Sequence, residues 1–350
     1  MKKIPKLKNI RNIVIFRTDR IGEVLLATPV IEALKRKFPQ ARLSFVTSAY
    51  ARDIVADRID LHEVITFDTI DRKVSLRGVL ALSSQLRKRR FDMAVILNSH
   101  KALHLAVFLA GIRYCVGFDR KWGFLLNYRV KDEREEAAMH EVMYNLEPLK
   151  LIGVDEKDIA PFVNVLSRNS YYVSGLLQQC GINPDKKTIA IHPGSSNPAK
   201  RWPVENFTEL VKRLAGFGGF NIIAVGDRSE KELCEKVIPA LGSKSVFSLA
   251  GLLTLKDLAA FFKKTDLLIT NDNGPMHIAA CVGAKVIAIF GRNMPGVSPK
   301  RWGPYGDGHI VFHKDPGCRP CYDKKCPYDF KCLRSITPDE VFEAAKRVLG

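Results

Sequence analysis

The sequence predicts a two-domain α/β protein in which each domain is a doubly wound parallel sheet. The 350 residues exceed what one hydrophobic core usually holds, so two domains of roughly 150 residues are expected. Strand-like apolar runs alternate with segments of helical periodicity along the chain, a pattern typical of parallel sheets covered by helices on both faces. The alternation restarts after a helix near Ser170–Cys180, which places one such domain in each half.

The first half alternates between strands and helices up to a linker. Its predicted strands are Asn12–Phe16, Leu43–Thr47, Val64–Phe67, Met93–Leu97 and Tyr114–Gly117. Its predicted helices are Val24–Phe38, ended by Pro39, Leu76–Arg89 and His140–Leu151. Gly153–Asn169 lacks periodicity and is interpreted as the linker.

The second half repeats the pattern and ends in a capped helix. Its predicted strands are Thr188–His192, Asn221–Val225, Leu267–Thr270 and Lys285–Phe290. Its predicted helices are Ser170–Cys180, Val204–Ala215, Ser229–Leu241, Leu255–Lys264, Pro275–Val282 and Thr337–Leu349, with Gly291–Gly317 as a loop. Thr337 is the expected N-cap of the last helix, with Glu340 three residues later. We place the domains at 1–165 and 166–335, and expect the terminal helix (336–350) to pack back on the N-terminal domain.

The composition favours anionic partners. Fifty-five Lys and Arg residues against 37 Asp and Glu give a net charge of +18, which attracts nucleic acid, phosphorylated metabolites or acidic lipid. The basic clusters at Lys2–Arg11, Lys35–Lys37, Arg87–Arg90 and Lys324–Lys325 accompany no recognisable nucleic-acid fold. No apolar run reaches the roughly 20 residues of a membrane-spanning helix, and no signal cleavage site follows the basic N-terminus. A cytoplasmic protein is expected, with either a generic basic surface or a peripheral contact to anionic lipid.

The first candidate site is the loop Arg17–Glu23, after the first strand. Ligands of doubly wound sheets bind beyond the carboxyl ends of the strands, so chemistry is expected in such loops. Gly22 allows a tight turn or a close approach to a ligand. Glu23 falls in the first turn of the next helix, where the dipole favours an ionised carboxylate able to accept a proton. The alternative for Glu23 is a helix-capping role.

The second candidate, His192–Pro203, has the features of a phosphate site. Gly194 is followed by the hydroxyls of Ser195 and Ser196, which can donate to phosphate oxygens. Lys200 adds a mobile positive charge for the same phosphates. The alternative is a plain loop with solvated basic side chains, since the Gly-Lys-Ser/Thr ending of a P-loop is missing.

The third candidate, Thr270–His277, joins a strand to a helix that opens at Asn273 and Gly274. The N–H groups and dipole of a first helical turn form an anion site suited to a pyrophosphate. Asp272, at the strand's end, is placed to accept hydrogen bonds from sugar hydroxyls. His277 lies one turn inside, where it either reaches a phosphate or has a structural role.

A fourth loop, Gly226–Glu230, also follows a strand. In a nucleotide-binding half-domain, a carboxylate at this place meets ribose hydroxyls. Glu230 or Asp227 is the candidate for that contact, and a simple helix cap is the alternative.

Four cysteines precede the terminal helix within fifteen residues, and they are Cys318, Cys321, Cys326 and Cys332. Four thiols can hold zinc tetrahedrally, although the two pairs lack matched short spacings. A structural zinc site and unligated or redox-labile thiols both remain open, and no catalytic metal is expected. The other cysteines, Cys115, Cys180, Cys234 and Cys281, are predicted to be buried in the core.

Together, these segments resemble glycosyltransferase family 9, the bacterial lipopolysaccharide heptosyltransferases. The resemblance covers nearly the whole chain and rests on Arg17–Glu23, His192–Ser196 with Lys200–Pro203, and Asn271–His277. It implies a GT-B fold, in which two Rossmann-like domains face a cleft, with the acceptor on the first and the ADP-sugar on the second. It further implies inverting transfer of a heptose to the lipid A–inner core acceptor without a catalytic metal or cofactor.

Carried over by position, the resemblance implies a base at Glu23, where the family more often has Asp. It implies acceptor contacts from Arg17 and Arg20. The donor contacts that it implies, or that the loops suggest, are Ser195, Ser196, Lys200, Glu230, Asp272, Asn273, Gly274 and His277.

Two other interpretations stay open beside this hypothesis. One is a related core or O-antigen transferase that uses another sugar nucleotide. The other is a non-catalytic basic protein that binds membrane or nucleic acid. For the transferase, the expected partners are a nucleotide-sugar donor, an anionic lipid-linked saccharide acceptor and the cytoplasmic face of the inner membrane. We expect no nucleic-acid partner and a monomer.

Overall fold

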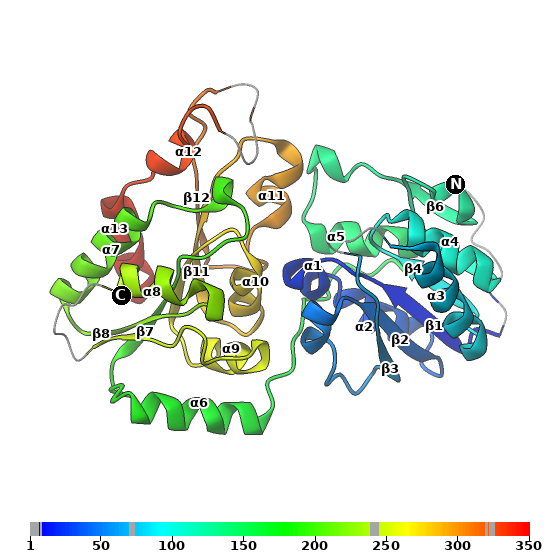
Figure 1. Cartoon of the computed structure of the whole chain (residues 1–350), viewed down its shortest axis with the longest axis horizontal. Coiled ribbons are helices and arrows are strands. Elements are labelled where there is room, and N and C mark those ends of the chain that lie inside the picture. The colour runs from blue at the N-terminus through cyan, green and yellow to red at the C-terminus, as the bar shows by residue number, and fades with distance from the viewer. Residues whose placement is uncertain (1–6, 8, 70–73, 239–244, 319–320, 322–325) are drawn as a thin grey trace. The chain divides into compact units, whose positions relative to one another are not determined.

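A computed structural model describes residues 7, 9–69, 74–238, 245–318, 321 and 326–350. The chain divides into two units, Met1–Asn164 and Val165–Gly350, each with one six-stranded sheet (Figure 1). The division falls one residue before the expected boundary between 165 and 166. The cluster Lys324–Lys325 and most of Lys2–Arg11 lie outside the described residues.

The N-terminal sheet is parallel throughout, in the order β3-β2-β1-β4-β5-β6. Its strands are β1 (Asn12–Phe16), β2 (Arg42–Thr47), β3 (Glu63–Thr66), β4 (Met93–Ile96), β5 (Tyr114–Asp119) and β6 (Tyr128–Lys131). The central strands are apolar and buried, because helices cover both faces of the sheet. In register, Ile13 of β1 pairs with Leu43 of β2 and Met93 of β4.

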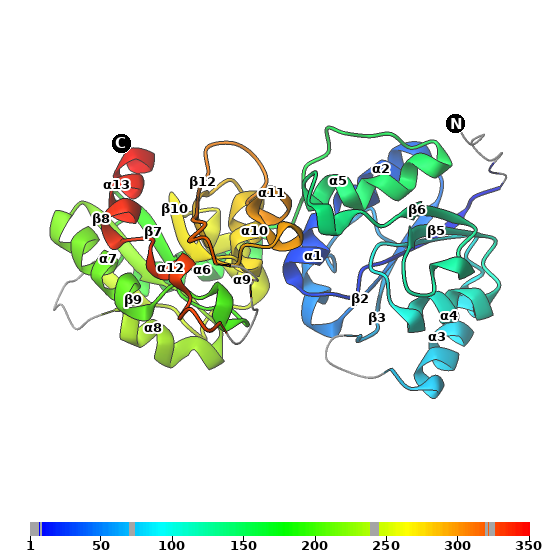
Figure 2. The same cartoon turned by 90° about the horizontal axis from the view of Figure 1, so that it is seen from above.

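The helices of this unit lie on both sides of the sheet. They are α1 (Ile21–Leu26), α2 (Pro29–Lys37), α3 (Leu76–Arg89), α4 (Lys101–Ala110) and α5 (Glu141–Leu146), with 3-10 turns at Ala49–Ile54, Gly123–Leu125, Arg134–Glu136 and Glu147–Ile152. In Figure 2, α2 and α5 lie on one side of the sheet and α3 and α4 on the other.

The helix predicted at Val24–Phe38 is two helices, and that prediction was wrong in two respects. The first helix already begins at Ile21, so Glu23 lies inside its first turn. The chain then breaks at Thr28, because Pro29 has no N–H and its ring excludes the carbonyl four residues earlier. The hydroxyl of Thr28 donates to the carbonyl of Leu25 and accepts from the N–H of Phe162, at 2.7 and 3.0 Å.

The C-terminal sheet has the same parallel design, in the order β12-β11-β10-β7-β8-β9. Its strands are β7 (Lys187–His192), β8 (Phe220–Ala224), β9 (Val246–Ser248), β10 (Leu267–Asn271), β11 (Lys285–Phe290) and β12 (Ile310–His313). Its helices are α6 (Ser167–Gln179), α7 (Val204–Phe217), α8 (Lys231–Val237), α9 (Leu255–Phe262), α10 (Gly274–Cys281), α11 (Pro299–Trp302), α12 (Lys331–Arg334) and α13 (Pro338–Leu349). The 3-10 turns are Pro198–Lys200, Arg228–Glu230 and Pro295–Val297.

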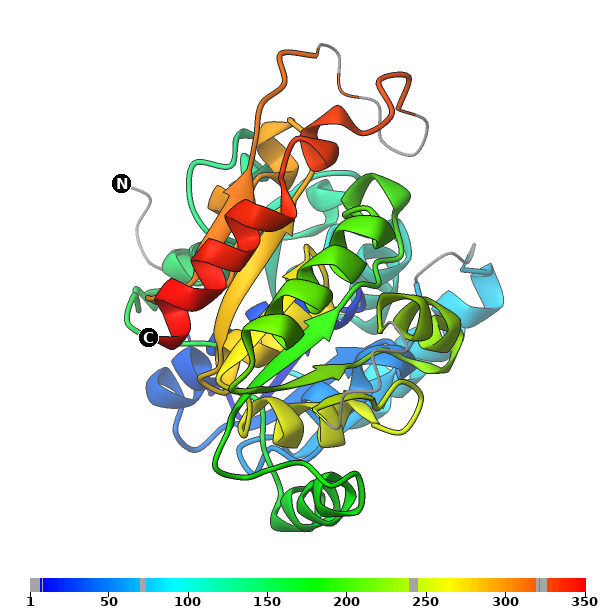
Figure 3. The ribbon, with the colours of Figure 1, turned by 90° about the vertical axis from the view of Figure 1, so that its left-hand side faces the viewer.

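The terminal helix α13 has the predicted cap but not the predicted packing. Thr337 and Glu340 form a reciprocal capping box, as expected from the sequence. The apolar face of α13, including Val341 and Ala345, is buried in the core of the C-terminal unit. The helix packs on α7 and β11, and Figure 3 shows it (red) beside α7 (green). The expectation that it returns to the N-terminal domain is therefore wrong.

Several short elements escaped prediction. The segment Gly291–Gly317, expected to be a loop, contains α11 and β12. The strands β6 and β9 and the helix α4 were also not predicted. Cys115 and Cys234 are buried as expected, whereas Cys180 and Cys281 are half-buried, which corrects their assignment to the core. Among the described residues, no helix is both long and apolar enough to cross a bilayer.

Candidate active site

The central strands of the C-terminal sheet, β7 and β10, create the most suitable place for a ligand. They are neighbours, and the chain leaves them toward opposite edges of the sheet, β7 toward β8 and β10 toward β11. At such a switch point the loops after the two strands diverge, and ligands of α/β sheets bind there. The candidate segments His192–Pro203 and Thr270–His277 lie where the chain leaves these two strands, and the candidate loop Gly226–Glu230 follows the adjacent β8.

Lys200 and Asp272 meet at this switch point. The Nζ of Lys200 lies 2.6 Å from an Oδ of Asp272, and the two side chains are 24% and 8% exposed. Lys200 ends a 3-10 turn that is capped by Asn197, whose side-chain oxygen accepts the N–H of Ala199. The two predicted ligand contacts thus come together from positions 72 residues apart. A partly accessible ammonium next to a buried carboxylate offers one group for an anion and one for hydroxyls.

Asn273 joins three parts of the site through its side chain. Its Oδ1 accepts the N–H of Met276 and caps α10 at 3.1 Å. Its Nδ2 lies 2.9 Å from the carbonyl oxygen of Gly194 and 2.9 Å from Nδ1 of His192. These bonds hold the loop after β7 against the start of α10. The amide predicted to contact the donor is therefore engaged within the protein.

Glu230 is likewise engaged. Its carboxylate lies 3.3 Å from Nε2 of His192 and accepts the N–H of Asp227 as half of a capping box. Burial by itself raises the pKa of Glu230. The hydrogen bond and charge of His192, helped by the N–H of Asp227 and the charge of Arg201, outweigh burial and lower that pKa. The carboxylate is therefore held ionised, and the predicted alternative of a helix cap is realised.

The remaining residues predicted to contact the donor lie at the same carboxyl-terminal edge of the C-terminal sheet. Ser195 is buried and Ser196 is exposed, and the carbonyl of Ser195 accepts from Nε of Arg201 at 2.5 Å. Gly274 is the first residue of α10, and His277 is buried one turn inside it. The N–H of Met276 is used by the cap and Pro275 has none, so the N–H of Gly274 is the donor at this helix start that points out of the helix.

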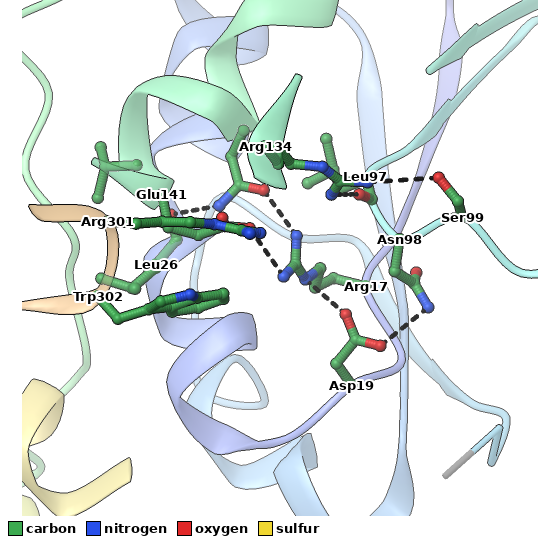
Figure 4. Close-up of polar contacts among 12 residues, drawn as sticks. Arg17, Asp19, Leu26, Leu97, Asn98, Ser99, Arg134, Glu141, Arg301 and Trp302 are labelled. Carbon is green, nitrogen blue, oxygen red and sulfur yellow. Dashed lines mark hydrogen bonds and ion pairs between the residues drawn. The ribbon is translucent and has the colours of Figure 1, made fainter. Parts of the chain in front are cut away.

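In the N-terminal unit, Arg17 is at the centre of a buried polar network (Figure 4). Its Nη1 donates to Asn145 at 2.8 Å, its Nη2 to Glu141 at 3.0 Å, and its Nε lies 2.9 Å from Asp19. Burial alone would lower the pKa of Arg17, but the carboxylates of Asp19, Glu141 and Glu23 raise it. Arg17 is 2% exposed, so in this structure its guanidinium is enclosed by these partners, and its contact with the acceptor stays a prediction.

Asp19, like Thr18, is a polar residue of this loop to which the sequence alone assigned no role. It lies after β1, and Asn98, after β4, donates to it at 3.2 Å (Figure 4). Asn98 also donates to Thr18 at 2.9 Å. Because β1 and β4 form the switch point of this sheet, the strand-end rule applied to β4 as well as β1 would have identified Asn98.

Glu23 and Arg20 flank this network. Glu23 is half-buried in the first turn of α1, and its charge contributes to the raised pKa of Arg17. Arg20 is exposed at the N-cap of α1. Of the two predicted acceptor arginines, Arg20 has the accessibility that such a contact needs.

All eight cysteines are thiols. In the described part of the chain, no three His, Cys, Asp or Glu side chains converge at spacings that could hold a metal ion. Cys318, Cys321, Cys326 and Cys332 nevertheless line one cavity.

Comparison with known proteins decides the family. Residues 79–331 match the sequence model of glycosyltransferase family 9 (heptosyltransferase). The chain belongs to this family. It is therefore a glycosyltransferase, and we set aside the interpretation as a non-catalytic basic protein.

Relatives and solved structures agree with the family assignment. The chain is 26% identical over 339 residues to lipooligosaccharide heptosyltransferase 2 of Campylobacter jejuni, covering 94% of this chain and 95% of the relative. A family 9 glycosyltransferase from Veillonella parvula superposes with a TM-score of 0.84 at 21% identity, over 97% of this chain and 98% of the other. The ADP-heptose heptosyltransferase II of Escherichia coli gives a TM-score of 0.77 at 23% identity, over 97% and 98%. The two-domain α/β fold is therefore the GT-B fold expected from the resemblance.

Proposed function

We propose that this family 9 glycosyltransferase transfers heptose from ADP-heptose to an inner-core lipopolysaccharide acceptor, with inversion and without a catalytic metal. The observation that carries the proposal is the Lys200–Asp272 pair at the switch point of the C-terminal sheet, beside the start of α10. The names of the relatives, a lipooligosaccharide heptosyltransferase and an ADP-heptose enzyme, support the donor and the acceptor.

The donor site is built for a diphosphate with a sugar attached. In the proposed complex, Lys200 turns from Asp272 toward the diphosphate, and the N–H of Gly274 and the dipole of α10 face the same oxygens. Asp272 then accepts hydrogen bonds from sugar hydroxyls, and Ser195 and Ser196 donate to phosphate oxygens. Glu230 is assigned the ribose, and its lowered pKa suits an acceptor of hydroxyl protons.

The chemical step is a single displacement. The acceptor oxygen bonds to the anomeric carbon while the bond from that carbon to the diphosphate oxygen breaks, and ADP leaves with the electron pair. The carboxylate of Glu23 takes the hydroxyl proton. Lys200 and the start of α10 stabilise the charge that develops on the diphosphate, which is the task a metal ion has in other transferases.

Single-turnover transfer with ADP-heptose and a lipid A–Kdo acceptor tests the role of Glu23. Glu23→Gln keeps the size and removes the base, so transfer should fall by about 100-fold or more while donor binding is retained. Glu32→Gln is the matched control, because Glu32 is a carboxylate on α2 whose side chain is 43% exposed and paired with Arg36. Equal transfer rates in the two variants would remove Glu23 from the reaction.

The donor is tested by calorimetry with a panel of sugar nucleotides. ADP-heptose should bind more tightly than UDP- or GDP-sugars. A preference for a UDP-sugar would assign the chain to the alternative, a core or O-antigen transferase with another donor.

The surroundings of the enzyme are part of the same proposal. A lipid-linked acceptor places it at the cytoplasmic face of the inner membrane, where the net charge of +18 favours anionic headgroups. We propose that it works there as a peripheral monomer. Co-sedimentation with anionic vesicles, and its loss at high salt, would test this placement.

A further inference from the structure

The α3–α4 layer, formed by the helices Leu76–Arg89 and Lys101–Ala110, covers one side of the N-terminal sheet. The two helices pack side by side (Figure 2), and Nη2 of Arg87 on α3 donates to the carbonyl of Leu109 on α4 at 2.5 Å. Neither helix contains an acidic residue. Other exposed helices carry both signs of charge, as in the Glu209–Arg213 pair of α7.

The charge of this layer is strongly one-sided. In the segment 74–113 the only acidic residue is Asp92, whose carboxylate accepts backbone N–H groups at the start of β1. The same segment contains seven basic residues, which are Arg77, Arg87, Lys88, Arg89, Arg90, Lys101 and Arg113. Among the residues that the structure describes, only Arg89 of these seven has a carboxylate partner, Glu63. The layer is therefore suited to an anionic partner.

Apolar side chains are exposed on the same layer. Leu76 and Leu80, one turn apart on α3, and Phe108 on α4 are each more than half exposed. Lys101, Leu105 and Phe108 recur at helical spacing on one face of α4, where only Leu105 is partly covered. Exposed apolar side chains flanked by lysine and arginine are typical of helices that lie in the surface of an anionic bilayer.

The turn after β5 extends this surface. Phe124 is exposed, and its ring centroid lies 6.5 Å from that of Trp122. The Nζ of Lys101 lies 5.8 Å from the ring centroid of Trp122. The acidic side chain beside this turn, Asp119, is paired with Arg129 at 3.2 Å. Because the turn follows β5 and α4 follows β4, both adjoin the carboxyl edge of the sheet, where the polar network of Figure 4 lies.

We propose that the α3–α4 layer and the turn Trp122–Phe124 dock on an anionic lipid bilayer. This inference rests on the peripheral placement in the proposed function and not on the identity of the sugar. The exposed leucines and phenylalanines enter the headgroup region, and Arg77, Lys88 and Lys101 lie at the lipid phosphates. A nucleic acid would match the charge but would leave the apolar side chains in water. A bilayer docked here brings a lipid-linked saccharide to the adjoining carboxyl edge of the N-terminal sheet.

Vesicle binding by the full chain tests the surface. The parent chain should bind phosphatidylglycerol–phosphatidylcholine vesicles more tightly than vesicles of phosphatidylcholine alone. Arg77→Gln/Lys88→Gln should weaken binding to the anionic vesicles by about 25-fold, because one basic residue at such a surface contributes about five-fold. Lys212→Gln/Lys263→Gln is the matched control, since it removes two exposed lysines of the C-terminal unit and gives the same net charge. Equal losses in the two variants would overturn the proposal.

Tryptophan fluorescence tests the insertion of the apolar side chains. Phe108→Trp should add emission that shifts to the blue on anionic vesicles and is quenched by lipids brominated in their acyl chains. Tyr171→Trp is the control, because Tyr171 on α6 of the C-terminal unit is 84% exposed, and its added emission should not be quenched. Absence of quenching at position 108 would overturn the proposal.

Heptose transfer to an acceptor saccharide without acyl chains, measured without vesicles, separates this inference from the proposed function. Arg77→Gln/Lys88→Gln should retain the parent rate there, because both side chains lie outside the candidate sites. Retained transfer with unchanged vesicle binding in that variant would overturn the surface and leave the reaction standing. Weakened vesicle binding in that variant, with no transfer by the parent chain, would contradict the reaction and support the surface.

Two further outcomes would also overturn the proposed surface. If the parent chain does not bind anionic vesicles, the peripheral placement fails together with the surface, whereas the transfer reaction is unaffected. If duplex DNA binds in place of vesicles, and Arg77→Gln/Lys88→Gln weakens that binding, the layer is a site for nucleic acid.

Discussion

Gly194→Ala is expected to destabilise the protein through a single neighbour, Glu230. A Cβ at position 194 would lie 1.8 Å from Oε1, 2.3 Å from Cδ and 2.9 Å from Oε2 of Glu230, and these are its three nearest atoms. Gly194 does not have a positive φ angle, so alanine can adopt its backbone conformation without strain. The only cost is the displacement of the carboxylate.

The size of the effect follows from the bonds that Glu230 loses. Its carboxylate bonds to His192 at 3.3 Å and to the N–H of Asp227 at 3.1 Å. Hydrogen bonds to charged groups contribute about 1.5–3 kcal/mol when buried. The side chain of Glu230 is 23% exposed, so water can replace part of the lost hydrogen bonding. We therefore expect Gly194→Ala to lower the free energy of unfolding by about 1–2 kcal/mol. Glu230→Ala should cost about the same for the same reason.

The double variant distinguishes this mechanism from general disruption. With Glu230 already truncated, alanine at position 194 meets no carboxylate, and its lower entropy in the unfolded chain stabilises by about 0.4–1 kcal/mol. The Gly194→Ala/Glu230→Ala variant should therefore be no less stable than Glu230→Ala. The free energies of unfolding of the two single variants would then depart from additivity by about 1–2 kcal/mol. Gly175→Ala on α6, with nothing within 4 Å of its added Cβ, is the control and should be additive with Glu230→Ala. The assay is urea unfolding followed by tryptophan fluorescence, since Trp202 is buried in this unit. Additive costs for Gly194→Ala and Glu230→Ala would refute the reasoning.

Three further changes test the scaffold by urea unfolding. Arg17→Met should cost about 3–5 kcal/mol, because Glu141 is fully buried and loses its cation; Arg17→Met/Glu141→Leu should recover much of that, and no recovery would contradict the pairing. His104 is buried, and burial with nearby positive groups lowers its pKa from 6.5 to about 4. The unfolded state therefore binds its proton first, so stability should fall by up to about 1.4 kcal/mol per pH unit between pH 6.5 and 4, and a pH series should lose this slope in His104→Leu. Thr337→Ala should cost about 1 kcal/mol by removing the cap of α13, and an unchanged urea midpoint would show that the Glu340 half of the box suffices.

The sequence predicted the elements whose signals are local. Buried strands such as Asn12–Phe16 are continuous apolar runs, and α13 carries its own cap, so both were found at or within one residue of their bounds. The helix α4 was missed because it is apolar nearly all round and shows little periodicity. The partner of α13 was predicted wrongly, because a cap identifies a helix without indicating which surface buries its apolar face.

In the candidate site, too, the sequence predicted what has a local signal and missed what depends on tertiary contacts. The strand-end rule predicted Lys200 and Asp272, which do come together. The sequence did not predict that Lys200 and Asp272 form an ion pair, or that Asn273 and Glu230 both contact His192. These contacts depend on which strands are neighbours in the sheet, and no local sequence pattern indicates the strand order. The acceptor contact of Arg17 was an implication of the resemblance, and no local pattern predicted that this side chain is buried. Its buried partners Glu141 and Asn145 come from α5, more than 120 residues away.

The most direct test of the central claim is the affinity of the chain for ADP in the Lys200→Met variant. If a nucleotide diphosphate binds at the switch point of β7 and β10, losing this ammonium should weaken ADP binding by about 10–100-fold, the equivalent of one charged hydrogen bond. Lys212→Met, which removes an exposed lysine from α7 of the same unit, should leave the affinity unchanged. ADP affinities by calorimetry that are equal in the two variants and the parent chain would contradict the placement of the donor at Lys200.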